Sequence, residues 1–380
     1  MRLLHTADWH LGKIVYGKSM LEDQKDFIYK FLLPLTDETT PDAIMISGDV
    51  FDRSIAPADA IKLFDDFVEE ICIKRNIKLL VSLGNHDGAD RFSLGEKLLR
   101  NSGFYISSKL QGEIQPITLC DDDCKVNIYM LPFFDVAAAK QYMSDDSLSS
   151  ADEAFSAVVK TVTGKLDENA VNIAMAHCYV SGSKLRSDGG YVGSLEPLDT
   201  AVLSPFDYVA LGHLHEQQQI GENAAYSGSP LKYSFDEEHQ KKGVFMLDIS
   251  RNNIEITAIP IVPTRDMRSI KGSFDELISA AQKDENNQDY IYARITGTPV
   301  FEPMAKLKEF YPNILGLING EEETQASDDR AGLREELRRT KPDKVKLFTS
   351  FLQQICGVEA TDEDVEIFNS VAENLGGESK

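Results

Sequence analysis

The sequence predicts an α/β fold, and three observations lead to that prediction. Short apolar runs at residues 2–6, 43–46 and 77–81 have the length and composition of buried strands. Amphipathic segments of helical period lie between them, which produces a β-α-β-α-β order. Polar side chains follow each run within a few residues, and open α/β sheets carry their chemistry where such strands end.

The composition indicates a globular protein with several domains. A chain of 380 residues has room for two or three of them. The net charge of −23 argues against a broad basic face that holds nucleic acid, although bound cations or a partner could supply positive charge. No apolar run is long enough to cross a bilayer, and Met1 leads almost directly into the first strand, so we expect neither a signal peptide nor a membrane location. Five cysteines without a CxxC pair predict reduced thiols in a cytoplasmic protein.

Two amphipathic helices are expected between the first three strands. The first covers about 21–35 and places Phe27, Phe31 and Leu35 on one face. The second begins at Pro57, because proline is favoured at the first helical position. Its apolar side chains recur at helical spacing: Ile61, Phe64, Val68 and Ile71.

The middle of the chain continues with strands and helices. The acidic triplet 121–123 indicates the turn of a surface hairpin, and two helices are expected between residues 136 and 166. A glycine- and serine-rich loop covers 181–194, and long loops in compact domains tend to be functional. Further strands are expected over 170–176, 208–211, 243–249 and 254–261.

The chain is expected to form three parts: a domain over 1–265, a small α+β domain over 266–343, and a helical tail over 344–380. The tail contains two short helices, and Thr361 with Asp364 has the pattern of a capping box at the start of the second. This tail folds back onto the body or docks a second protein. Its apolar positions are Val345, Phe348, Leu352 and Ile355, then Val365, Phe368, Val371 and Leu375.

Side chains that can bind metal ions recur where the strands end. Asp8 and His10 follow the first strand, and a carboxylate with an imidazole two residues away can chelate one ion. Asp49 follows the second strand. A single such residue could cap a helix or pack, but five of the seven histidines lie at strand ends. The complete set of expected ligands is Asp8, His10, Asp49, Asn85, His177, His213 and His215.

Seven ligands suit two metal ions that share one carboxylate, and Asp49 is the natural bridge. Two ions about 3.5–4 Å apart can bind a phosphate diester and activate water. Mixed oxygen and imidazole ligands fit Mn²⁺, Fe²⁺ or Zn²⁺ better than Mg²⁺ or Ca²⁺. The seven ligands do not include His86, so His86 is the candidate catalytic residue. It would orient the phosphate or protonate the leaving oxygen. Lys13, Tyr16 and Lys18 lie on the loop after His10, where they are either solvated or contact a phosphate backbone.

The set D-x-H, G-D-x-x-D, G-N-H-D, a lone histidine and G-H-x-H resembles the calcineurin-like metallophosphoesterases. Residues 6–12, 208–215 and 227–235 are similar to the bacterial SbcD family of nuclease subunits. The resemblance implies a four-layer β-sandwich flanked by helices, a capping domain after it, and two tail helices that attach to an SbcC-type coiled-coil ATPase.

The same resemblance implies a homodimeric, manganese-dependent exonuclease and hairpin endonuclease that processes DNA double-strand breaks. It assigns Asp8, His10, Asp49 and His215 to one ion, and Asp49, Asn85, His177 and His213 to the other. Other members carry histidine where this chain has Asp52, so Asp52 either touches substrate or caps the following helix. A phosphodiesterase for small nucleotides would use the same ligands without the tail, and a non-catalytic scaffold would not need them all.

Overall fold

The computed structural model describes residues 1–93, 95–184, 197–251, 253–298 and 300–319, with 348–349, 361, 364–365 and 368. The chain divides into two compact units, Met1–Arg294 with Glu302–Leu317 and Ile295–Phe301 with Ile318–Lys380. Among the described residues, no helix has the length and apolar character needed to cross a membrane. The expected boundaries near 265 and 343 remain predictions.

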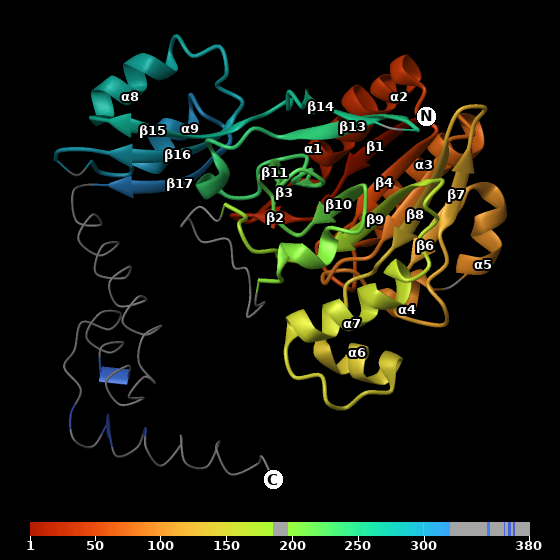
Figure 1. Ribbon diagram of the computed structural model, residues 1–380. Helices are drawn as coiled ribbons and strands as arrows, with labels where there is room; N and C mark the ends of the chain where they lie inside the picture. Colours follow the sequence, from red (N-terminus) through yellow and green to blue (C-terminus); the bar gives the residue numbers. More distant parts are fainter. Residues whose placement is uncertain are drawn as a thin grey trace. The chain divides into compact units, whose positions relative to one another are not determined.

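Two six-stranded sheets form the centre of the first unit (Figure 1). The first has the order β14 (Asn253–Pro260), β13 (Gly243–Ser250), β1 (Arg2–Thr6), β4 (Ala43–Ser47), β5 (Lys78–Ser82) and β6 (Phe104–Ser107). The second has the order β11 (Gln218–Ile220), β12 (Ala224–Tyr226), β10 (Tyr208–Gly212), β9 (Val171–His177), β8 (Lys125–Met130) and β7 (Ile117–Cys120). The central strands run parallel within each sheet, so their carboxyl ends gather at one edge.

The two sheets pack face to face with helices outside them, which confirms the four-layer architecture. Successive residues of one strand enter different cores: Leu3 packs between the sheets and Leu4 under the helices. Both faces of the central strands are therefore buried, which explains their continuous apolar runs. The helices over the first sheet are α1 (Leu21–Asp26), α2 (Leu33–Thr39) and α3 (Ala58–Val68), with π-helical turns at Phe27–Leu32 and Glu69–Lys74.

A helical hairpin covers the second sheet. It consists of α6 (Val136–Met143) and α7 (Ala151–Thr163), which pack against each other and are called the α6–α7 lobe below. Asp135 and Ser150 cap the two helices by accepting hydrogen bonds from backbone N–H groups. Both helices and the hairpin of β7 and β8 agree with the predictions from the sequence.

The apolar faces of the first helices differ in detail from the expected ones. Ile28 and Leu32 are fully buried, whereas Phe31 is only partly buried. Ile61 was expected on the buried face of α3, and this prediction is wrong: Ile61 is 47% exposed, and Leu63 and Phe67 are buried instead. The π-helical turn at Phe27–Leu32 interrupts the regular helical period around Phe31. Ile61 lies before the second π-helical turn, and its exposure has another reason: Ala60, Leu63, Phe64 and Phe67 form the regular buried stripe of α3, and Ile61 lies off it.

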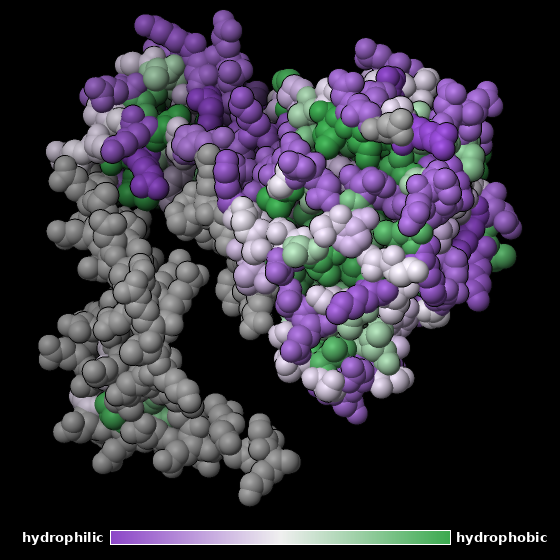
Figure 2. Space-filling model, viewed as in Figure 1, coloured by the Kyte–Doolittle hydropathy of each residue, from purple (hydrophilic) through white to green (hydrophobic). Residues whose placement is uncertain are grey.

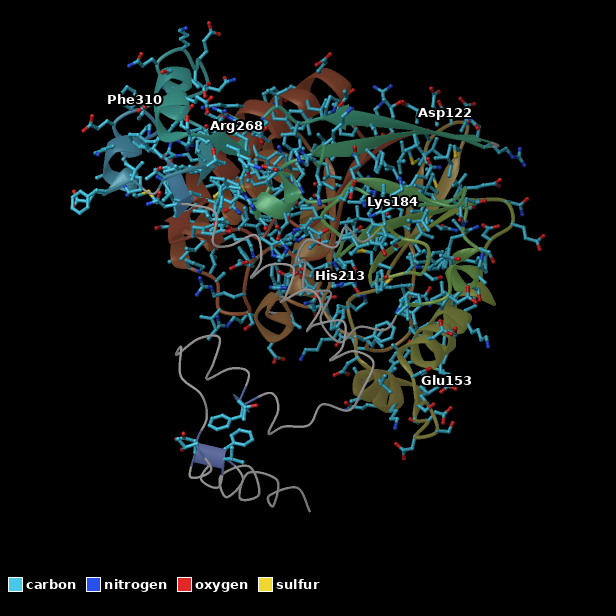
Figure 3. All side chains as sticks on the ribbon, turned by 90° about the vertical axis from the view of Figure 1, so that its left-hand side faces the viewer. Asp122, Glu153, Lys184, His213, Arg268 and Phe310 are labelled. Carbon is cyan, nitrogen blue, oxygen red and sulfur yellow. The ribbon has the colours of Figure 1, made fainter. Side chains whose placement is uncertain are left out.

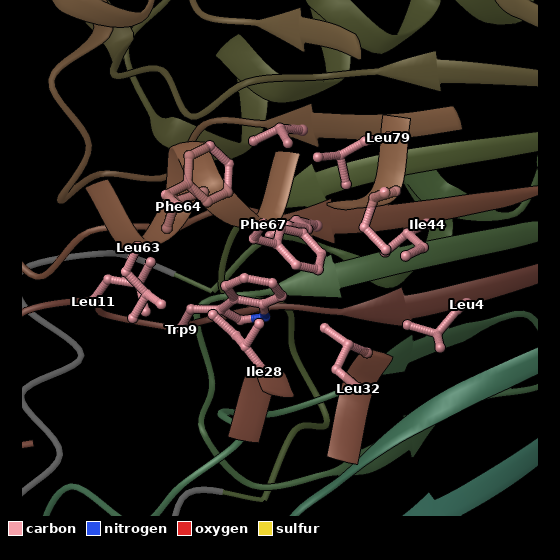
Figure 4. Close-up of a cluster of buried hydrophobic side chains, with 14 of the residues drawn as sticks. Leu4, Trp9, Leu11, Ile28, Leu32, Ile44, Leu63, Phe64, Phe67 and Leu79 are labelled. Atoms are coloured by element: carbon pink, nitrogen blue, oxygen red, sulfur yellow. The ribbon is translucent and has the colours of Figure 1, made fainter. Parts of the chain in front are cut away.

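Trp9 is the largest fully buried side chain of the first core (Figure 4). Its ring contacts Phe27 and Phe67 edge to face, at centroid distances of 5.4 and 4.9 Å. Its indole N–H donates to Thr6 Oγ1 at 2.9 Å. Because Trp9 lies between two expected metal ligands, this core holds the chain on both sides of them.

The smaller sheet has the order β15 (Met267–Gly272), β16 (Tyr290–Ile295) and β17 (Ile314–Asn319). The helices α8 (Phe274–Ala281) and α9 (Pro303–Lys308) lie between these strands in the sequence, as expected for an α+β arrangement. The buried carboxylate of Asp23 accepts hydrogen bonds from Arg265 at 2.8 Å and from the Tyr290 hydroxyl at 2.6 Å. This contact ties α1 to the segment that follows β14.

Few residues of the expected tail are described. The rings of Phe348 and Phe368 stack at a centroid distance of 4.4 Å. The Thr361 backbone N–H donates to the Asp364 carboxylate at 2.9 Å, and the Asp364 N–H donates to Thr361 Oγ1 at 3.3 Å, which confirms the capping box. Among the predicted tail positions, Val345, Leu352, Ile355, Val371 and Leu375 lie outside the described residues, as does most of the loop over 181–194.

Replacing Trp9 with alanine is expected to destabilise the protein by about 3–5 kcal/mol, the usual cost of removing a large aromatic ring from a core. Denaturant unfolding measures this cost. The control Leu98→Ala removes a side chain that is 76% exposed, and we expect a change of about 0.5 kcal/mol or less. Equal effects of the two substitutions would contradict the assigned role of Trp9.

Candidate metal centre

The expected ligands come together where strands of both sheets end. Asp8 and His10 follow β1, Asp49 follows β4, and Asn85 with His86 follows β5. The second sheet supplies the remaining histidines: His177 at the end of β9, then His213 and His215 after β10. Figure 3 shows His213 within the body of the first unit, whereas Glu153 marks the outlying α6–α7 lobe.

Four of these residues have a left-handed backbone, which is uncommon for non-glycine residues. The φ angles are 54° for Asp8, 46° for His10, 51° for Asp49 and 106° for His213. Hydrogen bonds hold the conformation: the Asp8 N–H donates to the Gly48 carbonyl at 3.0 Å, and the His10 N–H donates to the Asp49 carbonyl at 2.9 Å. Strain of this kind concentrates at functional sites, where the surrounding structure maintains it.

Two glycines permit the close approach of the sheets. A Cβ atom on Gly48 would lie 2.0 Å from Nδ1 of His177, and one on Gly212 would lie 1.7 Å from the carbonyl oxygen of Ser47. No side chain fits at such distances. Glycine is therefore required at both positions if His177 is to reach Asp49.

Asp49 lies at the centre of the cluster. Its Oδ2 atom is 3.6 Å from His10 Nε2 and 3.4 Å from His177 Nε2. Two further contacts extend the cluster on either side: His10 Nε2 lies 3.1 Å from His215 Nε2, and His177 Nε2 lies 3.1 Å from the Asn85 amide oxygen. All seven expected ligands are brought together, with Asp49 between two groups of them.

The buried charges perturb one another strongly. Burial raises the pKa of Asp8 to about 6, with Asp49 adding to the rise. Burial raises the pKa of Asp49 too, but the imidazoles of His177 and His10 outweigh it and hold that pKa well below its ordinary value. Burial lowers the pKa of His177, yet the carboxylates of Asp49 and Asp8 overcome this and raise it to about 9. A proton on His177 thus neutralises part of the buried negative charge.

The donor atoms fit divalent metal ions. Two buried imidazole nitrogens, His10 Nδ1 and His213 Nε2, have no hydrogen-bond partner among the described residues, which is costly unless something binds them. Two groups of three side chains have ligand atoms within 4.8 Å of one another: Asp8, Asp49 and His177, and Asp49, His10 and His86. Carboxylate, amide and imidazole donors together are suited to Mn²⁺, Fe²⁺ and Zn²⁺.

His215 is oriented by a residue that sequence analysis did not find. Its Nδ1–H donates to Oε1 of Glu237 at 2.9 Å, which leaves Nε2 with its lone pair toward His10. The other carboxylate oxygen of Glu237 accepts from the buried ammonium of Lys242 at 2.6 Å. Lys242 also donates to the His215 carbonyl and to Ser229 Oγ, both at 2.9 Å. No local pattern marks Glu237, because its partner lies 22 residues away.

Asp87, the last residue of the G-N-H-D motif, had no expected role. Its carboxylate accepts from the backbone N–H groups of Val50, Phe51 and Gly84, at 3.3, 3.0 and 2.9 Å. Burial, with the charge of Asp49, raises its pKa to about 7. Asp87 therefore binds the loop after β4 to the loop after β5. These three backbone donors come together around the carboxylate only when the chain folds.

His86 differs from the ligands in exposure and orientation. Its side chain is 41% exposed. Nδ1–H donates to the Asp52 carbonyl at 2.8 Å, and Nε2 lies 4.0 Å from Asp49 Oδ2. The ring therefore lies beside the metal ligands with one nitrogen available to a substrate.

The loop after His10 borders the site. Lys13 Nζ donates to the Asp52 carboxylate at 2.6 Å, and α3 has Pro57 at its N-cap with no side-chain cap, so Asp52 does not cap that helix. Tyr16 is 57% exposed, and its ring contacts Phe235. Lys18 is exposed in the short hairpin of β2 (Ile14–Val15) and β3 (Lys18–Ser19).

The two histidines without an expected role lie outside the cluster. Buried His5 accepts from the Tyr208 hydroxyl at 3.0 Å and donates Nε2–H to the Leu211 carbonyl at 3.2 Å. It links β1 to β10 across the two sheets. His239 is exposed, at 77% of its side chain, beside Glu238.

Comparison with known proteins agrees with this fold. The family model described as calcineurin-like phosphoesterase matches residues 1–217, and the model described as type 5 capsule protein repressor C-terminal domain matches residues 263–355. The chain is therefore a calcineurin-like phosphoesterase. It is 37% identical over 325 residues to the D subunit of the SbcCD nuclease of Staphylococcus epidermidis, covering 84% of this chain and 85% of that protein. Within the phosphoesterases, the chain belongs to the SbcD family of nucleases.

Among solved structures, the TT1561 protein of Thermus thermophilus is similar over 68% of this chain and 98% of its own. The sequence identity is 11% and the TM-score 0.39.

Metal binding is expected to strengthen as the pH rises toward about 9, because an incoming cation competes with the proton on His177. His177 keeps that proton at pH values below its pKa of about 9 in the folded protein and loses it at higher pH. Calorimetric titration with Mn²⁺ in two buffers of different ionisation enthalpy counts the protons released, and we expect about one between pH 7 and 8. Affinity that stays constant from pH 7 to 9 would contradict this assignment.

Glu237→Ala is expected to lower metal affinity about 10- to 100-fold, the usual effect of losing a residue that orients a histidine ligand. Glu237→Gln keeps an acceptor for His215 Nδ1–H and should retain more affinity. Titration of bound metal measures both variants. Glu222→Gln, at an exposed position, is the control; a control loss as large as that of Glu237→Ala would refute the orienting role.

Proposed function

We propose that this protein is a metal-dependent DNA nuclease, a double-strand exonuclease and hairpin or single-strand endonuclease that acts with an SbcC-type ATPase in double-strand-break processing. The observation that supports it most is the position of Asp49 between two histidine groups, in a chain 37% identical to an SbcCD nuclease subunit. The alternative, a phosphodiesterase for small nucleotides, would need the same centre.

Two divalent ions, Mn²⁺ in our proposal, would supply positive charge and an activated water at this centre. Asp8, His10, Asp49 and His215 would hold one ion, and Asp49, Asn85, His177 and His213 the other. The contacts of His10 with His215, and of His177 with Asn85, support this division. The side chains of the protein would orient the phosphate diester and transfer protons to or from it.

His86 is the proposed catalytic residue. Its Nδ1–H is committed to the Asp52 carbonyl, so Nε2 can hold a proton toward the substrate. Among the histidines of the cluster, its exposure suits contact with a phosphate oxygen or the leaving oxygen. Lys13, Tyr16 and Lys18, on the hairpin beside the site, are proposed to contact the DNA backbone.

The partners belong to the same proposal. A chain with a net charge of −23 gains affinity for DNA from a partner that brings positive surface. The tail over 344–380 is proposed to dock the ATPase, supported by the capping box at Thr361 and the stacked rings of Phe348 and Phe368. A homodimer is proposed as well. The expected location is the cytoplasm.

His86→Ala is expected to retain both metals and to lose about 10²–10⁴ in cleavage rate, the scale of a lost acid–base group. Asp49→Ala should lose cleavage and bind one ion or none, because it removes the ligand between both groups. Elemental analysis and cleavage of linear and hairpin DNA, beside a small phosphodiester, measure these effects. Loss of metal from His86→Ala would make His86 a ligand, and preference for the small ester would favour the alternative.

Deletion of all residues after Lys341 is expected to leave a folded, metal-loaded nuclease that no longer co-purifies with the ATPase. Its cleavage of short DNA should persist, while stimulation by ATP disappears. Helices as short as those predicted in the tail are marginal alone and need a surface to cover their apolar faces. A truncated chain that binds the ATPase with unchanged affinity would refute the docking role.

A further inference from the structure

A cavity of about 400 Å³ adjoins the metal centre. It lies between the end of β9, the loop after β8 and the first turns of the α6–α7 lobe, and its wall includes Phe133, Phe134, Tyr179 and the proposed metal ligand His177. This volume is within the range of about 300–1,000 Å³ typical of small-molecule sites. Figure 2 shows apolar side chains reaching the surface over this lobe.

A backbone hydrogen bond joins the wall of the cavity to the loop that leads into the metal centre. The Phe133 N–H donates to the Leu83 carbonyl at 2.7 Å, just before the loop that carries Asn85 and His86. The rings of Phe133 and His177 meet edge to face at 6.4 Å. A group bound in the cavity would therefore lie beside whatever the metal centre holds.

The wall favours a flat, uncharged occupant. It contains no lysine or arginine among its described residues, and its one carboxylate, Asp135, would repel a phosphate. Phe134 stacks on Phe155 at 5.7 Å, which presents a rigid aromatic wall. Aromatic walls of this kind bind nucleobases by stacking, independent of base identity.

The polar side chains that the lobe contributes to the wall, those of Asp135, Ser149 and Ser150, form hydrogen bonds within the lobe. The Asp135 carboxylate accepts from the Ala138 N–H at 2.8 Å, and Ser150 Oγ accepts from the Glu153 N–H at 3.2 Å. The Ser149 hydroxyl donates to the Glu153 carboxylate at 2.7 Å. These side chains cap the helices of the lobe, and we expect them to take no part in distinguishing one base from another.

We infer that the cavity receives the base of a nucleotide next to the scissile phosphate, without sequence preference. The inference rests on the proposed nuclease function. Because a base must leave the duplex stack to enter, the site favours unpaired or frayed DNA, for which unstacking costs least.

Ala137 offers a direct test, because it lines the cavity and is exposed. Ala137→Trp should fill the cavity without disturbing a core. Gln141→Trp, exposed on α6 outside the cavity wall, is the matched control. The substrates are a single-stranded oligonucleotide and its counterparts with one abasic residue on either side of the scissile phosphate.

The wild-type protein should cleave one abasic substrate about 5- to 150-fold more slowly than the intact strand, the scale of one base–aromatic stack. Ala137→Trp should cleave the intact strand at that reduced rate, with no further abasic penalty and unchanged metal content. Phe134→Ala should likewise cleave the intact strand at the reduced rate, with no further abasic penalty. Gln141→Trp should match the wild type.

Two outcomes overturn the inference alone: DNA cleavage by the wild type without an abasic penalty, or an undiminished penalty in Ala137→Trp. Absence of any DNA cleavage by the metal-loaded wild type overturns the proposed function, and the inference with it. A variant that misfolds is recognised by its metal content, and Phe134→Ala then supplies the comparison.

Discussion

The contact between the ends of β4 and β9 is the constraint on which the site depends. The His177 Nδ1–H donates to the Ser47 carbonyl at 2.9 Å, and the Ser47 hydroxyl donates to the Ala210 carbonyl at 2.9 Å. These bonds join one sheet to the other at the edge where the ligands gather. If the sheets separated there, Asp8 and Asp49 of the first would lose the histidines of the second, and both groups of side chains around Asp49 would be incomplete.

Core packing keeps this contact in place and supports the strained backbone around it. Residues from both sheets form one apolar layer between them, which includes Leu3, Met45 and Met175. On the outer side of the first sheet, Trp9 fixes the loop between Asp8 and His10. Left-handed conformations at the ligands persist because packing and hydrogen bonds on all sides over-determine them. The packing of the core thus maintains the geometry of the site.

The electrostatics of the centre explain how so acidic a protein can act on a polyanion. Buried Asp8 and Asp49 repel each other, and only protons or cations can neutralise them. Bound divalent ions would reverse the local field and attract a phosphate diester to a chain whose net charge is negative. The cavity beside His177 contains no lysine or arginine among its described residues, which suits a base better than a phosphate. In the proposed function, recognition of DNA then depends on local groups and a partner, because the overall charge opposes binding.

The sequence by itself predicted the α/β class, the order of the strands along the chain, and the side chains that the fold brings together around Asp49, because each of them follows an apolar run that ends in polar residues. It misplaced Ile61, because an apolar side chain can recur at helical spacing beside the buried stripe, and only packing shows that Ala60, Leu63, Phe64 and Phe67 form that stripe. Only the tertiary structure decided the roles of Glu237 and Asp87 and the cavity beside His177. Their contacts join segments distant in the sequence, and side-chain distances across two sheets follow from packing, which local pattern does not encode.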